Sequence, residues 1–80
     1  MKEPVNGKRF VREFGVVVRR KRHKINLSQE DFADKAGIHR TYVSSIELGK
    51  VDIGMRVAYK LATALNTPLS KLIKETEDSI

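Results

Sequence analysis

Residues 39–48 place small polar side chains and one arginine on what would be the outer face of a helix. If Val43, Ile46 and Glu47 face inward, positions 40, 41, 44, 45 and 48 face outward. An arbitrary solvated face would carry Lys or Glu in a chain that is 32% charged. Arginine can donate two hydrogen bonds to guanine O6 and N7, and a threonine methyl can pack on a thymine methyl. We therefore predict a face that enters the major groove of DNA, with the base-reading residues Arg40, Thr41, Ser44 and Ser45.

Apolar stripes at helical spacing predict the elements that position this face. Four residues recur at i, i+4, i+7 and i+8 and predict a helix over residues 8–24: Phe10, Phe14, Val17 and Val18. Shorter stripes predict further helices over residues 29–36, about 39–48, 55–65 and from 69 onward. No segment alternates as a strand does. The sequence therefore predicts an all-α, compact five-helix domain.

The junction between the second and third of these helices contains residues with specific steric roles. Ser28 stands three residues before a carboxylate, a variant of the capping box that starts a helix. Ala33 is small enough for a close helix crossing, and Gly37 accepts a positive φ at the turn. Val43 and Ile46 are branched anchors on the following helix. The pattern predicts two short helices joined by a tight turn.

The stretch Gln29–Leu48, QEDFADKAGIHRTYVSSIEL, resembles the helix-turn-helix of the lambda-repressor-like (Xre-type) DNA-binding family. Similarity to that family extends on both sides and covers about residues 14–73. The resemblance implies a five-helix fold in which the second and third helices form the helix-turn-helix and the third reads DNA. The motif HRTYVS at residues 39–44 looks most like the restriction-modification controller proteins within this family.

Further site residues follow from the resemblance or from their position. The resemblance implies that Gln29 grips the DNA backbone and that Lys50 meets a phosphate after the loop glycine. Tyr42 borders the same surface, where it either touches DNA or covers the second helix. Arg22 and Glu47 both fall on apolar faces, where an unpaired charge is very costly, and the resemblance places an ion pair there. We therefore expect a buried structural ion pair between them.

The basic run at residues 19–24 divides by helical position. Arg19, Arg20 and Lys24 are expected to be solvated or to steer DNA over long range. Lys21 is expected to lay its methylene groups along the core edge and keep its ammonium in water. The loop after Lys50 departs from the family pattern, because residues 51–54 read VDIG where relatives usually have a more polar or basic stretch. Asp52 weakens a phosphate contact there and is expected to cap the fourth helix instead.

Composition limits the fold and the class of partner. The 80 residues allow one domain, divided into an N-terminal lead (residues 1–7), a DNA-binding domain (8–75) and a C-terminal tail (76–80). The formal charge of +6 is concentrated in residues 1–24, which hold nine basic and two acidic side chains, so a polyanionic partner is expected. The chain has no cysteine and no metal-ligand spacing, so we expect neither metal nor cofactor. Its longest apolar run, residues 16–18, predicts a cytoplasmic protein without a membrane span.

The function predicted from these features is sequence-specific transcriptional regulation. A single module of this kind buries little DNA surface, so we expect a homodimer on double-stranded DNA with a palindromic operator. Its interface would lie on the last helix, with the candidate contacts Leu69, Leu72 and Ile73. The chain lacks a sensing module, so no small-molecule ligand is expected.

A second class of function remains open on sequence grounds. The same fold can act as a protein-interaction module, such as the antitoxin of a toxin-antitoxin pair or a coactivator. Sequence-dependent binding to duplex DNA distinguishes the two classes. An enzyme is excluded by the lack of a phosphate loop, of cysteine and of any cluster of catalytic residue types.

Overall fold

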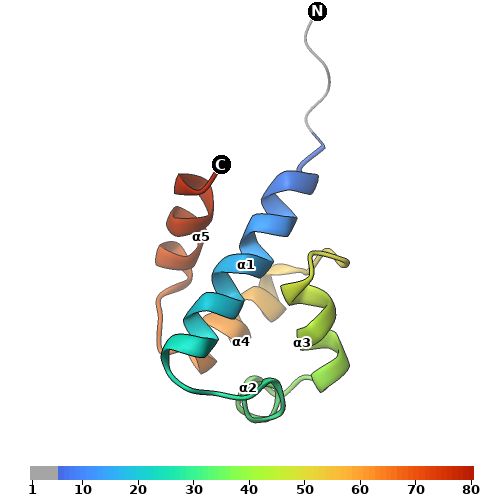
Figure 1. Ribbon diagram of the computed structural model, residues 1–80, viewed down its shortest axis with the longest axis vertical. Helices are drawn as coiled ribbons and strands as arrows, with labels where there is room; N and C mark the ends of the chain where they lie inside the picture. The colour runs from blue at the N-terminus through green and yellow to red at the C-terminus, as the bar shows by residue number, and fades with distance from the viewer. Residues whose placement is uncertain (1–5) are drawn as a thin grey trace, which may run out of the picture.

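The computed structural model describes residues 6–80 as five helices joined by short loops (Figure 1). The helices are α1 (Lys8–Lys24), α2 (Gln29–Ala36), α3 (Arg40–Glu47), α4 (Met55–Ala64) and α5 (Leu69–Asp78). The predicted all-α fold is therefore confirmed. Of the predicted N-terminal lead, residues 1–5 lie outside the described part of the chain.

The long helix α1 is the element around which the others are arranged. It packs against α5 on one side and α3 on the other, while α2 contacts α3 and α4 (Figure 1). Asn6 Oδ1 accepts a hydrogen bond from the Lys8 N–H at 2.9 Å at the start of α1. Asn26 has a left-handed φ of 58° just beyond its end, a conformation that asparagine adopts more readily than most residues. Both ends of α1 are thus determined by local sequence.

A close approach between α1 and α3 depends on the absence of a side chain at Gly15. A Cβ built at Gly15 would lie 2.8 Å from the Glu47 carbonyl oxygen and also against the Ile46 carbonyl. The buried residues next to it on α1, Phe14, Val17 and Val18, fill the space between α1 and the other helices. The C-terminal end of α3 is therefore held directly against α1.

The C-terminal helix extends further than the sequence analysis predicted. Helix α5 runs to Asp78, and Thr76 is fully buried, with its hydroxyl donating to the Leu72 carbonyl at 2.8 Å. Residues 76–78 of the expected C-terminal tail therefore belong to α5, and the domain boundary expected after residue 75 falls inside this helix. In α4, Met55 was expected on the buried stripe but is 83% exposed.

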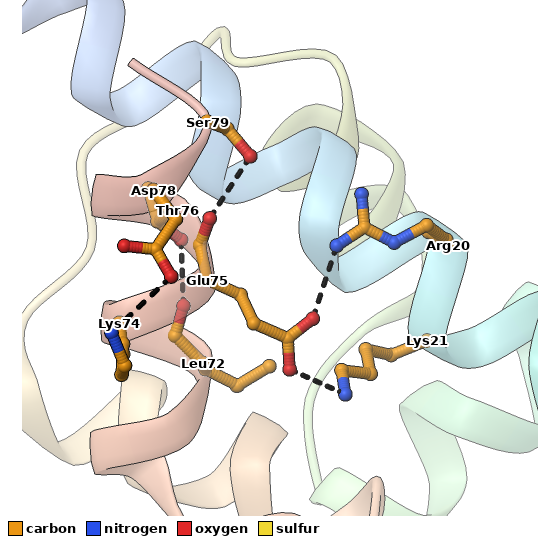
Figure 2. A network of polar contacts seen from close by, with 8 residues as sticks. All are labelled: Arg20, Lys21, Leu72, Lys74, Glu75, Thr76, Asp78 and Ser79. Carbon is orange, nitrogen blue, oxygen red and sulfur yellow. Dashed lines mark hydrogen bonds and ion pairs between the residues drawn. The ribbon is translucent and has the colours of Figure 1, made fainter.

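An ion-pair cluster links α1 to α5 (Figure 2). Glu75 on α5 contacts the Arg20 guanidinium at 3.1 Å and the Lys21 ammonium at 2.6 Å, both on α1. The hydrogen bond from Lys21, followed by that from Arg20, lowers the pKa of Glu75 against an opposing effect of burial. The Arg20 side chain is 53% exposed, in agreement with the expectation that it is solvated, whereas the Lys21 ammonium, expected in water, pairs with a carboxylate of α5 instead.

Helices of the described chain are too short or too polar to cross a membrane.

Candidate nucleic-acid interface

Local capping interactions fix the two helices that carry the predicted DNA-contacting residues. Ser28 Oγ accepts the Asp31 N–H at 3.0 Å at the start of α2, as predicted. Gly37 ends α2 with a left-handed φ of 70°. His39 then starts α3, where its Nδ1 accepts the Thr41 N–H at 3.2 Å. Both helices therefore begin at residues whose side chains satisfy free N–H groups.

The inward face of α3 combines two apolar anchors with one buried carboxylate. Val43 and Ile46 belong to the core, and the Glu47 side chain is only 2% exposed. Glu47 receives Arg22 Nε at 2.7 Å and Arg22 Nη2 at 2.9 Å. Arg22 Nη1 donates to the Leu27 carbonyl at 2.8 Å. The structure thus brings together the two members of the expected ion pair and ties α1, α3 and the α1–α2 loop to one another.

A glutamine joins this ion pair, which the sequence analysis did not foresee. Gln29 Nε2 donates to Glu47 Oε1 at 3.1 Å, so the amide at the start of α2 is oriented by a carboxylate of α3. This bond uses one of the two amide hydrogens and leaves the other available for a further acceptor. The half-buried Gln29 is therefore held in place beside the outward face of α3.

The outward face of α3 contains the predicted base-reading residues in two degrees of exposure. Arg40 and Thr41 are exposed, whereas Ser44 and Ser45 are half-buried. Arg40 makes no ion pair with any residue from 6 to 80. The Thr41 hydroxyl lies 2.7 Å from His39 Nδ1, an acceptor for the hydroxyl proton when the ring carries its hydrogen on Nε2. Arg40 is thus the long hydrogen-bond donor of this face.

Comparison with known proteins gives matches to a family model, to named relatives and to a solved structure. A helix-turn-helix family model matches residues 18–72. The chain is 43% identical over 56 residues to control protein C.SmaI of Serratia marcescens, which covers 70% of this chain and 67% of that protein. It is 39% identical over 57 residues to control protein C.MunI of Mycoplasma sp, covering 71% of this chain and 77% of that protein.

The chain belongs to the helix-turn-helix family. A solved structure is also similar, the restriction-modification controller protein C.AhdI from Aeromonas hydrophila, with a TM-score of 0.76 and 35% identity. That match covers 78% of this chain and 94% of C.AhdI. The predicted resemblance to Xre-type proteins, and to their controller proteins in particular, is confirmed.

Residues around the helix-turn-helix show which expectations the geometry supports. Tyr42 is half-buried and packs against the core, and its two expected roles, contact with DNA or cover of α2, stay predictions. Lys50 is exposed directly after the left-handed Gly49. Asp52 was expected to cap α4, but the N-cap is Gly54 and no side chain accepts a hydrogen bond there. Asp52 therefore stays in the loop as an exposed negative charge.

A cleft of about 330 Å³ beside the helix-turn-helix adds one residue to the interface. Gln29, Ser44 and Leu48 line it together with Arg19, which we expected to be solvated or to steer DNA over long range. The place of Arg19 in this cleft was not predicted, because it depends on how α1 crosses α3. Arg19 thus adds a positive charge next to the outward face of α3.

The three residues expected at a dimer interface differ in their availability. Leu72 is fully buried within the monomer, so its side chain has no surface to offer a partner. Leu69 and Ile73 are half-buried and line an apolar groove of about 370 Å³ with Phe10 and Met55. Only Leu69 and Ile73 therefore stay as candidate contacts of α5. Within residues 6–80, no group of three or more His, Asp or Glu side chains is arranged to hold a metal ion.

Proposed function

We propose that the protein is a sequence-specific DNA-binding transcriptional regulator whose α3 enters the major groove as the recognition helix. The observation that carries this proposal is the contrast within one helix. The inward face of α3 is anchored by Val43, Ile46 and the Arg22–Glu47 pair. Its outward face has no carboxylate, and it presents Arg40 beside short polar side chains. Such a face approaches base edges closely and does not repel phosphates.

The identity of the relatives gives this function a narrower form. C.SmaI and C.MunI are named control proteins, and C.AhdI is described as a restriction-modification controller protein. We infer a controller-type regulator that acts in the cytoplasm, without a cofactor, a small-molecule ligand or enzymatic activity. The net charge of +6 supplies non-specific attraction to DNA.

The proposed assembly is a homodimer on a palindromic operator. Paired recognition helices read half-sites one helical turn, about 34 Å, apart. Leu69 and Ile73 support the proposal, because they are half-buried apolar residues next to the exposed Met55 at one groove. Sedimentation at micromolar concentration tests it: a dimer is expected, and a monomer that persists on palindromic DNA would contradict it. The Ile73→Asp variant should be more monomeric than wild type at the same concentration.

Selection from a pool of random duplexes tests the function itself. The purified protein should enrich one sequence with two-fold symmetry and bind it at least ~10³-fold more tightly than a scrambled duplex at the same salt concentration. Binding that is independent of sequence would overturn the proposal. It would favour the alternative, a protein-interaction module of the same fold such as an antitoxin or a coactivator.

A further inference from the structure

A second positively charged cleft lies away from the outward face of α3. It has a volume of about 290 Å³ and is formed by the start of α1 and the loop that follows α3. Three of its lining side chains are cationic and one is anionic: Lys8, Arg12, Lys50 and Asp52. Residues 8 and 12 are one helical turn apart and thus share one face of α1. The cleft therefore gathers cations from segments about forty positions apart in the sequence.

The contact between Gly49 and Arg12 holds the two walls of this cleft together. A Cβ at Gly49 would lie 2.9 Å from the Arg12 Cα, so only glycine lets the loop approach α1 this closely. Gly49 also has a φ of 69°, which favours glycine on conformational grounds. The next N–H, that of Lys50, donates to the Ser45 carbonyl at 2.9 Å. Lys50 is therefore fixed beside Arg12 rather than carried on a free loop.

The cations of this cleft lack the carboxylate partners that three basic residues near the end of α1 have. Arg20, Lys21 and Arg22 all form ion pairs. Lys8, Arg12 and Lys50 are exposed, and none of them pairs with a carboxylate among residues 6–80, although Asp52 lines the same cleft. The three positive charges repel one another, and the single negative charge only partly offsets this repulsion. A bound anion would reduce it further. The cleft is thus suited to phosphate.

We propose that Lys8, Arg12 and Lys50 form a phosphate-binding cleft that holds the DNA backbone beyond the C-terminal end of the recognition helix. The proposal rests on the proposed DNA-binding function and adds a backbone anchor to it. In Figure 1 the loop after α3 lies beside the first turns of α1, so one strand could pass from α3 to the cleft. Lys8 and Arg12 precede residues 18–72, which the family model matches. Lys50 lies within the matched residues, so Lys8 and Arg12 are the new part of this anchor.

Salt dependence of DNA binding provides the first test. Arg12→Gln and Lys8→Gln each remove a charge at an exposed position, and Arg9→Gln is the matched control on the same exposed turn but outside the cleft lining. Each cleft variant should lower the slope of log K against log salt by about 0.9 and weaken binding about fivefold to tenfold near 0.1 M salt. The loss should be the same for selected and scrambled duplexes. Circular dichroism melting should show unchanged folding.

A duplex with neutral methylphosphonates at the flanking backbone positions provides the second test. If Arg12 binds a flanking phosphate, wild type and Arg12→Gln should bind this duplex equally tightly, because the contact is already lost. Equal slopes for wild type, Arg9→Gln and Arg12→Gln would overturn the cleft. Equal losses in the Arg9→Gln and Arg12→Gln variants would also overturn it, because they indicate only long-range charge.

The cleft and the proposed function can fail separately. Wild-type binding without sequence preference overturns sequence-specific regulation, yet the loss at Arg12 would still be measurable on any duplex. Conversely, specific binding with no effect of Arg12→Gln overturns the cleft and leaves the function in place.

Discussion

The two faces of α3 differ in what their residues contact. On the inward face, Val43 and Ile46 pack in the core and Glu47 pairs with Arg22. On the outward face, Arg40 and Thr41 are exposed. Arg40 forms no ion pair with any other residue of the described chain. Core packing and the buried ion pair account for the residue types on the inward face. We expect the outward residues to contact a molecule outside the protein.

We infer from this difference that stability and recognition are divided between the two faces of the eight-residue α3. Changes on the inward face should alter the free energy of unfolding, and through it every function. Changes on the outward face should alter DNA binding and leave folding intact. The following predictions test whether the division holds, from the largest effect to the smallest.

The buried ion pair should show the largest effect. Arg22→Met or Glu47→Met leaves one charge buried without its partner, which should lower the free energy of unfolding by about 3–5 kcal/mol. The double variant, with two apolar side chains, should recover much of that loss. Urea denaturation measures all three, with Arg40→Ala as the control that unfolds like wild type. Losses in the double variant equal to the sum of the single ones would contradict a coupled pair.

Arg40→Ala should affect binding alone. Loss of a bidentate contact to guanine should weaken binding to the selected duplex by about 1–3 kcal/mol and relax the preference at one base pair. Fluorescence anisotropy with a set of single-base variants of the duplex measures both quantities. A change in the unfolding midpoint would show that Arg40 also supports the fold, against the division between the two faces.

Lys50→Ala should weaken binding without changing its sequence preference. Because a phosphate contact carries no base information, the loss should be the same on selected and scrambled duplexes, and the salt slope should fall by about 0.9. Lys60→Ala, an exposed lysine on α4, is the control. An altered base preference in Lys50→Ala would mean that the boundary of the reading face lies further along the chain.

Glu75 should contribute the smallest effect, and its contribution should depend on pH. Its pKa is lowered by Lys21 and Arg20, so the stabilisation is complete above the ordinary carboxyl pKa and disappears as the pH falls through the lowered, folded-state value. Since its side chain is 26% exposed, we expect less than about 1 kcal/mol at neutral pH. Thermal unfolding of wild type and Glu75→Gln should therefore differ at pH 7 and converge in acid. A difference that grows in acid would contradict this sign.

Much of the inward structure was predictable because local patterns determine it. The bounds of α1 follow from its apolar stripe and from Asn26, the start of α2 follows from Ser28, and the turn before α3 follows from Gly37. The pairing of Arg22 with Glu47 was expected from their positions on apolar faces together with the resemblance to Xre-type proteins. In each case a residue's neighbours in sequence, or the cost of burying a charge, limited the outcome.

Polar contacts between side chains of distant segments could not be predicted in the same way. The pairing of Glu75 with Lys21, the hydrogen bond from Gln29 to Glu47 and the cleft at Arg12 depend on helix crossings. Neither periodicity nor composition determines a crossing angle. The true end of α5 was also missed, because the apolar stripe ends before the buried Thr76, a polar residue that bonds to the backbone.

The most direct test of the central claim is a cycle that combines Arg40→Ala with 7-deazaguanine at the base pair whose preference Arg40→Ala relaxes. Removing guanine N7 takes away one acceptor of the bidentate contact and leaves the shape of the duplex unchanged. The account predicts that wild type loses affinity on the modified duplex, whereas Arg40→Ala binds the modified and unmodified duplexes almost equally. Equal losses for both proteins would contradict the claim that the outward face of α3 reads bases through Arg40.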